Sequence, residues 1–113
     1  MSDQDQTTSH ILDRLHTTVQ ARKGADPASS YTASLFHKGR GKIAQKLGEE
    51  AVECVIEAMR DDGHAIVAES ADLLYHLTVL WADAGVEPAQ VWAALEARVG
   101  TSGLDEKAAR VKD

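Results

Sequence analysis

The stretch that decides the fold is residues 42–76, which read KIAQKLGEEAVECVIEAMRDDGHAIVAESADLLYH. It holds two pairs of acids with two residues between the partners, Glu50 with Glu53 and Glu69 with Asp72. Apolar residues recur around both pairs at helical spacing, which predicts two helices. Residues three apart lie on one face of a helix, about 5–6 Å between Cβ atoms, so each pair points two carboxylates the same way.

If the two helices pack side by side, the four carboxylates converge and repel one another. Two like charges ~5 Å apart cost roughly 3 kcal/mol at an effective dielectric of ~20. A hard divalent cation with oxygen ligands removes this cost, and Mg²⁺ suits a site of carboxylates, water and substrate phosphates. Zinc would prefer histidine and cysteine. We therefore predict a site for Mg²⁺, with Mn²⁺ as a substitute, at Glu50, Glu53, Glu69 and Asp72.

The acids also have a purely structural interpretation. Those of the first helix would form a solvated face, although like charges three or four residues apart are mildly destabilising. Glu69 and Asp72 would be buried acids satisfied by hydrogen bonds or by His76, which is itself expected to be a core or surface histidine. Unpaired acids are rare on a buried helix. The occurrence of two pairs together favours the metal site.

Basic residues gather just before the acids. Lys46 lies one turn before Glu50, and Gly39-Arg40-Gly41 predicts either a flexible turn that closes over an anion or an ordinary connection between helices. The lysines have an alternative role in ion pairs on the helix surface. A triphosphate that bridges metal ions and lysines would use both signs of charge, so we predict a Mg²⁺-dependent hydrolase of a phosphoanhydride. The upstream cations are His37, Lys38, Arg40, Lys42 and Lys46.

The composition narrows the class of protein. The 113 residues predict one domain over residues 1–113, for which dimerisation would enlarge a small core. A net charge of −6 and an aromatic content of 4% argue against a nucleic-acid partner. No apolar run approaches the ~20 residues of a membrane span. The single cysteine, Cys54, fits a reducing cytosol, so we predict a cytoplasmic protein.

Hydrophobic spacing predicts an all-α protein, since no segment shows the alternation of a strand. Ser9 and Ser30 are predicted N-caps, and Gly85 a predicted helix stop. The third long helix is apolar over a wide arc, which predicts burial on more than one side. The predicted helices cover residues 9–22, 31–38, 42–60, 64–84 and 88–99, between a disordered segment 1–8 and a polar tail 101–113. The helix 42–60 is expected to place one stripe in the core: Ile43, Leu47, Ala51, Val55 and Ala58.

Three phrases of the sequence closely resemble the phosphoribosyl-ATP pyrophosphohydrolase family, which acts at the second step of histidine biosynthesis. They are Ser-Tyr-Thr at 30–32, Lys-Leu-Gly-Glu-Glu-Ala-Val-Glu at 46–53 and Glu-Ser-Ala-Asp-Leu-Leu-Tyr-His-Leu at 69–77. The tail 101–107 is also similar, and the resemblance covers roughly residues 15–110. Ser70 stands where the family usually has alanine. The paired acids alone mark the wider MazG-like all-α NTP pyrophosphatase superfamily.

The resemblance implies a MazG-like bundle of four to five helices that forms a homodimer and holds Mg²⁺ at the four acids. It implies hydrolysis of phosphoribosyl-ATP to phosphoribosyl-AMP and pyrophosphate. We expect Glu49 or Glu53 to take a proton from the attacking water. The predicted phosphate contacts are Lys46, Lys42, Arg40 and His37. The alternatives are a house-cleaning (d)NTP pyrophosphatase and a non-enzymatic helical dimerisation module.

Overall fold

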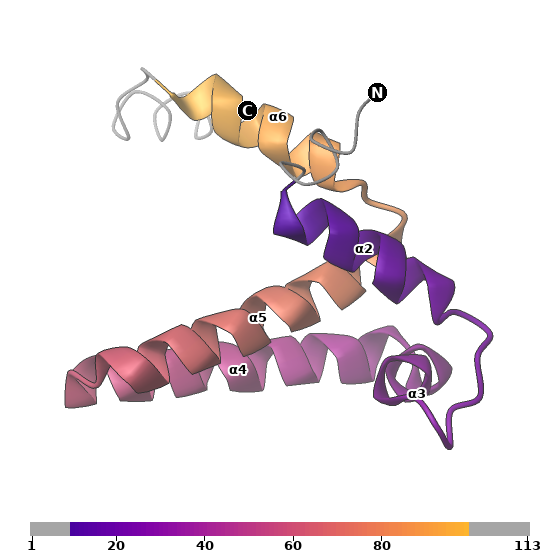
Figure 1. The fold of residues 1–113 in the computed structure, drawn as a ribbon, viewed down its shortest axis with the longest axis horizontal. Coiled ribbons are helices and arrows are strands. Elements are labelled where there is room, and N and C mark those ends of the chain that lie inside the picture. The colour runs from indigo at the N-terminus through magenta and orange to yellow at the C-terminus, as the bar shows by residue number, and fades with distance from the viewer. Residues whose placement is uncertain (1–9, 100–113) are drawn as a thin grey trace.

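The computed structural model describes residues 10–99, and over this range the chain is helical with no strand (Figure 1). This confirms the all-α prediction. The predicted cap Ser9, the segment 1–8 and the tail 101–113 lie outside the described residues. The helices are α2 (Ile11–Ala21), α3 (Tyr31–Lys38), α4 (Arg40–Arg60), α5 (Gly63–Ala84) and α6 (Pro88–Arg98).

Short polar side chains and glycine set the helix ends. The Ser30 hydroxyl accepts a hydrogen bond from the Ala33 backbone N–H at 3.1 Å, as predicted for the N-cap of α3. Asp62 caps α5 in the same way, through the backbone N–H of Ala65. Gly85, with a φ of 73°, ends α5 in the left-handed conformation that glycine adopts without strain.

The connection between α3 and α4 is too short to be a flexible turn, which was one of the two predicted forms of Gly39-Arg40-Gly41. Gly39, with a φ of 96°, is the only residue between the two helices, and Arg40 and Gly41 already belong to α4. The flexible turn closing over an anion is therefore wrong, and the ordinary connection between helices is confirmed. The physical reason is that one glycine with positive φ suffices to change the chain direction.

The core lies at one end of the molecule. α4 and α5 form a long antiparallel hairpin, and α2 and α3 pack against the end where α4 begins and α5 finishes (Figure 1). α6 lies on α2, where the Trp92 indole N–H donates to the Asp13 carboxylate at 3.1 Å. The buried apolar side chains of this core are Val19, Leu35, Ile43, Val79 and Ala82.

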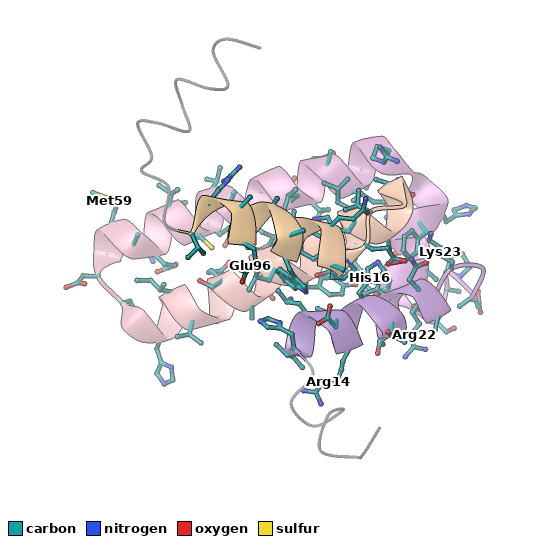
Figure 2. The ribbon with its side chains drawn as sticks, turned by 90° about the horizontal axis from the view of Figure 1, so that it is seen from above. Arg14, His16, Arg22, Lys23, Met59 and Glu96 are labelled. Atoms are coloured by element: carbon teal, nitrogen blue, oxygen red, sulfur yellow. The ribbon has the colours of Figure 1, made fainter. Side chains whose placement is uncertain are left out.

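The other end of the hairpin carries much less buried surface than predicted. Of the expected stripe on α4, Ile43 is buried, but Val55 is 62% exposed. The buried residues of α5 all lie at or after His76, so the prediction that the first half of this helix is buried is wrong for the single chain. Figure 2 shows Met59 at the opposite end of the molecule from Lys23, which lies beside the core. Exposed apolar side chains follow this end of the hairpin: Val52, Val55, Ile56, Met59 and Val67.

None of the helices within residues 10–99 has the length and apolarity that crossing a lipid bilayer requires.

Leu35 tests the location of the core. Its side chain is 1% exposed, and we expect Leu35→Ala to lower the free energy of unfolding by about 2–5 kcal/mol through lost burial and a cavity. Urea denaturation followed by circular dichroism measures this change. Leu95→Ala, at a side chain that is 50% exposed, is the matched control. Equal losses in the two variants would contradict the assignment.

Candidate metal centre

Three of the four predicted metal ligands meet in the structure. Glu50 on α4 and Glu69 and Asp72 on α5 each offer a carboxylate oxygen, and these oxygens lie within 4.8 Å of one another. The spacing of three residues puts the two acids of α5 on one face, and the packing of α4 along α5 brings Glu50 opposite them. The arrangement offers a cation three oxygen ligands from two helices.

Glu69 is the acid with the least satisfied surroundings. One of its carboxylate oxygens, Oε2, is buried and has no hydrogen-bond partner among the described residues. Burial raises the pKa of Glu69, and the charges of Glu53, Glu50 and Asp72 raise it further. A group in these surroundings keeps its negative charge only with difficulty, and a bound cation would supply the missing compensation.

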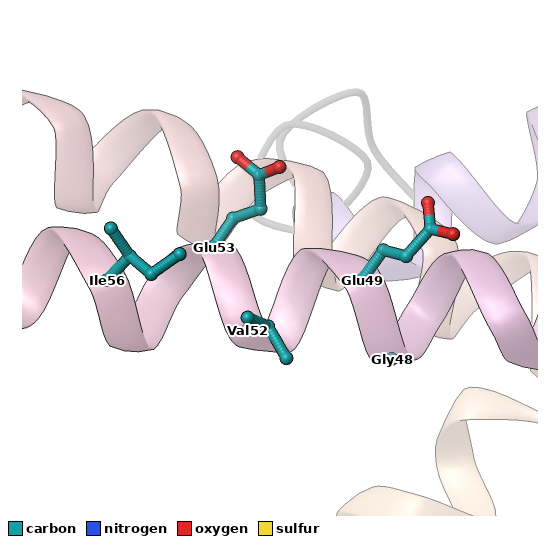
Figure 3. A pocket seen from close by; sticks show the side chains of 5 residues that line it. All are labelled: Gly48, Glu49, Val52, Glu53 and Ile56. Atoms are coloured by element: carbon teal, nitrogen blue, oxygen red, sulfur yellow. The ribbon is translucent and has the colours of Figure 1, made fainter.

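Glu53 lies beside this group of three without belonging to it. Its charge reaches Glu69, but its oxygens are not among those that lie within 4.8 Å. Glu53 lines an open hollow on α4 together with Gly48, Glu49, Val52 and Ile56. Figure 3 shows the carboxylates of Glu49 and Glu53 rising on the same side of α4, while Val52 turns away from them.

Lys46, one turn before Glu50, forms an ion pair with Glu49. Lys46 Nζ donates to Glu49 Oε1 at 3.1 Å, and the side-chain amide of Gln45 donates to Glu49 Oε2 at 2.8 Å. The hydrogen bond from Gln45 lowers the pKa of Glu49, and Lys46 lowers it further. The bond to Glu49 in turn raises the pKa of Lys46. Glu49 is thus a well-satisfied anion that holds the ammonium group in place.

The remaining predicted phosphate contacts lie farther along the chain. The Arg40 guanidinium bonds the Asp83 carboxylate, and its Nη2 donates to the Asp83 carbonyl at 3.3 Å. Arg40 begins α4 ten residues before Glu50, about 15 Å along a helix axis. His37 is exposed in the last turn of α3, and Lys42 is half-buried in the first turn of α4. The structure does not bring Arg40 to the three carboxylates.

Two residues outside the predicted ligands and phosphate contacts lie at the edge of this site. His76, which was expected to be a core or surface histidine, is buried: its Nδ1 lies 2.9 Å from the Asp72 carbonyl oxygen, and its Nε2 lies 3.2 Å from the Tyr31 hydroxyl. The spacing of four residues from Asp72 could have placed His76 on the face of the acids. Tyr31 belongs to the Ser-Tyr-Thr phrase of the resemblance, but no helical spacing could have paired it with His76, because α3 brings it from 45 residues away.

The all-helical fold and the carboxylates that two antiparallel helices turn toward each other are consistent with the MazG-like class of NTP pyrophosphatases. The model of one family, described as phosphoribosyl-ATP pyrophosphohydrolase, matches residues 12–99. The chain therefore belongs to the phosphoribosyl-ATP pyrophosphohydrolase family, which confirms the resemblance found in the sequence.

Similar curated proteins agree with this family. The chain is 67% identical over 107 residues to a phosphoribosyl-ATP pyrophosphatase of Azospirillum brasilense, covering 95% of this chain and 96% of the relative. It is 62% identical to the protein of the same name from Paramagnetospirillum magneticum, covering 92% and 95%. The corresponding protein of Rhodospirillum rubrum is 61% identical, with 90% and 87% covered.

The raised pKa of Glu69 predicts how the metal-free protein responds to pH. The folded state holds this proton to a higher pH than the unfolded chain, so the contribution of Glu69 to stability falls as pH rises above 4.5 through the folded pKa. Glu69→Gln removes this ionisation. With a chelator present to remove metal ions, the free energy of unfolding of Glu69→Gln minus that of the wild type should increase over that pH range.

Urea denaturation at a series of pH values measures the difference. Glu96→Gln is the control, because Glu96 is an exposed acid on α6. If the stability of Glu69→Gln depends on pH in the same way as that of the wild type, burial and neighbouring charges do not raise the pKa of Glu69.

Proposed function

We propose that this protein hydrolyses phosphoribosyl-ATP to phosphoribosyl-AMP and pyrophosphate, the second step of histidine biosynthesis, and that it requires Mg²⁺. One observation carries the proposal: Glu50, Glu69 and Asp72 offer oxygens within 4.8 Å of one another. The chain that does so belongs to a pyrophosphohydrolase family, and the relatives it matches are named phosphoribosyl-ATP pyrophosphatases.

The chemistry of the donors supports a hard cation. The converging atoms are carboxylate oxygens, which Mg²⁺ prefers, and one buried oxygen of Glu69 lacks a partner among the described residues. Glu50, Glu69 and Asp72 would hold the ion, and Glu53, one turn along α4, is the proposed fourth ligand. When bound, Mg²⁺ neutralises phosphate charge and lowers the pKa of bound water. Mn²⁺ would substitute for it.

The basic residues bind the phosphates in this proposal. Glu49 holds the Lys46 ammonium one turn before Glu50, where it would meet the phosphate chain and offset charge in the transition state. Lys42 continues the cationic side of α4 by one turn. Arg40 and His37 remain predicted contacts for the far end of the substrate, and Arg40 would have to exchange Asp83 for phosphate.

Glu53 is the better candidate for the base that takes the proton. The oxygen of water attacks the α-phosphorus, the bond to the bridging oxygen breaks, and pyrophosphate leaves. The lowered pKa of Glu49 and its two hydrogen bonds make it a weak proton acceptor. Glu53 is exposed and rises on the same side of α4 (Figure 3).

A second copy of this chain is the partner that we infer. The exposed apolar side chains of α4 and α5, Val52, Val55, Ile56, Met59 and Val67, follow the end of the hairpin that lacks a core. Such a group is more than scattered surface apolarity. Burying one such side chain fully is worth about 1.5–3 kcal/mol. A homodimer would thus supply the burial that the sequence pattern of α5 predicts. A single domain over residues 1–113 and a cytoplasmic location stay predictions.

The proposed reaction is tested by pyrophosphate release from phosphoribosyl-ATP with and without Mg²⁺. We expect release by the wild type only with the metal ion, and no release by Asp72→Ala, which loses a ligand. Glu53→Gln should lower kcat by about 10²–10⁴-fold, as the loss of a general base does. If its Mg²⁺-dependent rise in melting temperature is kept, Glu53 is the base alone; if that rise is lost, Glu53 is also a ligand.

Glu57→Gln is the control for this assay, because Glu57 lies on α4 but pairs with Arg60 at 3.8 Å. Faster release from a deoxynucleoside triphosphate than from phosphoribosyl-ATP would replace the proposal by the house-cleaning alternative. If neither substrate releases pyrophosphate and Mg²⁺ does not raise the melting temperature, the non-enzymatic dimerisation module is the remaining alternative.

The dimer is tested by light scattering in solution. We expect twice the mass of the chain for the wild type and a monomer for Val55→Lys, because a buried ammonium group is costly to desolvate. Leu95→Lys changes an equally apolar and exposed position on α6 and should leave the dimer intact. A monomeric wild type, or a Val55→Lys variant that still dimerises, would count against this interface.

A further inference from the structure

A tyrosine at the edge of the carboxylate site bonds a buried histidine through its hydroxyl. Tyr31 is 53% exposed, whereas His76 is 5% exposed. The Tyr31 hydroxyl lies 3.2 Å from His76 Nε2, and His76 Nδ1 lies 2.9 Å from the backbone carbonyl oxygen of Asp72. A relay of two hydrogen bonds therefore joins Tyr31 to the turn of α5 that carries Asp72.

The relay has one direction when the His76 ring is neutral. A carbonyl oxygen only accepts hydrogen bonds, so His76 Nδ1 must carry the proton that it donates to Asp72. In the neutral ring, Nε2 is then an acceptor, and the Tyr31 hydroxyl must be the donor. With its proton directed inward, the phenol oxygen of Tyr31 has only acceptor capacity left on its exposed side.

The position of this oxygen follows from the antiparallel hairpin. On α5, Glu69, Asp72 and His76 lie on one stripe at spacings of three and four. Because α4 runs the other way, the turn after Asp72 lies beside the turn before Glu50, where Lys46 is. Tyr31 on α3 reaches this point through its hydrogen bond to His76, whose Nδ1 bonds the Asp72 carbonyl oxygen.

A nucleotide bound with its phosphates on the carboxylate site and Lys46 would thus meet Tyr31 about one helical turn, ~5 Å, farther along the hairpin. With the His76 ring neutral, an ionised phosphate oxygen is not a partner for the Tyr31 oxygen, because both atoms are then acceptors.

We propose that Tyr31 binds the nucleotide by accepting a hydrogen bond from a neutral donor group, a ribose hydroxyl or a base amino group. His76 is the positioning residue that accepts the hydrogen bond of the Tyr31 hydroxyl and so leaves the Tyr31 oxygen as an acceptor. The inference rests on the proposed function for the identity of the substrate, but it concerns a contact outside the metal ligands and the phosphate-binding cations.

A pair of tyrosines provides a matched experiment. The rings of Tyr31 and Tyr75 stack with centroids 6.3 Å apart, but the Tyr75 hydroxyl is half-buried and bonds the Thr32 hydroxyl. Tyr31→Phe keeps the ring and should raise KM for phosphoribosyl-ATP about three- to tenfold, the effect of one neutral hydrogen bond. Its kcat should change little, while its melting temperature should fall modestly because the buried His76 Nε2 loses its partner. Tyr75→Phe should lower the melting temperature and leave KM unchanged.

His76→Asn tests the positioning role. Asparagine can still donate to the Asp72 carbonyl from the place of Nδ1, but it cannot reach Tyr31. In this background, Tyr31→Phe should change KM by less than it does in the wild type, because the two residues act as one unit. Independent, additive changes in KM would reduce His76 to a structural residue and would overturn its part of the proposal.

Binding of Mg²⁺ with ATP, 2′-deoxy-ATP, 3′-deoxy-ATP or inosine triphosphate, measured by calorimetry, separates the sources of the donor. A preference for ATP over a deoxy form identifies a sugar hydroxyl, and a preference over inosine triphosphate identifies the amino group. Tyr31→Phe should abolish that preference. If the wild type does not turn over phosphoribosyl-ATP, the proposed function fails. Weaker ATP binding by Tyr31→Phe would still support the contact between Tyr31 and the nucleotide. Unchanged KM and unchanged binding, or a wild type that binds no nucleotide, would overturn it.

Discussion

Repulsion between carboxylates on two packed helices is the constraint on which the rest of this structure depends. The apolar core joins the beginning of α4 to the end of α5, and the hairpin then continues past the core with Glu50 facing Glu69 and Asp72. At that end, apolar side chains such as Val55 and Val67 are exposed in the single chain and do little to offset the repulsion. The fold thus gives up stability at the site, and a divalent cation bound only by the folded state would restore it.

Two acids on this hairpin show how surroundings divide chemical roles between identical side chains. Glu49 accepts hydrogen bonds from Gln45 and Lys46, which lower its pKa and keep it an anion. Glu69 has a buried oxygen without a partner among the described residues, and burial raises its pKa. The first arrangement fixes a cation of the protein itself, and the second is suited to an ion from solution. The proposed active site needs both.

Local patterns in the sequence predicted most of the helices and the convergence of the carboxylates, because helical spacing decides both. What they could not predict depends on contacts between distant segments. The alignment of α4 with α5 leaves Glu53 beside the three converging acids, and α3 brings Tyr31 to His76. Burial was also misjudged, since an apolar pattern such as that of Val55 does not say whether its own chain covers it.

The two tryptophans lie far from the metal ligands. Trp81 and Trp92 meet edge to face with ring centroids 5.9 Å apart, and the Trp92 indole bonds Asp13. Trp81 follows Asp72 by nine residues, about 13 Å along α5. Intrinsic tryptophan fluorescence therefore reports how α2 and α6 pack on the core, and it responds little to changes in the far half of the hairpin. An emission signal that stays constant during a cation titration would accordingly describe the location of the fluorophores, and a probe placed near Met59 would be needed to observe the other end.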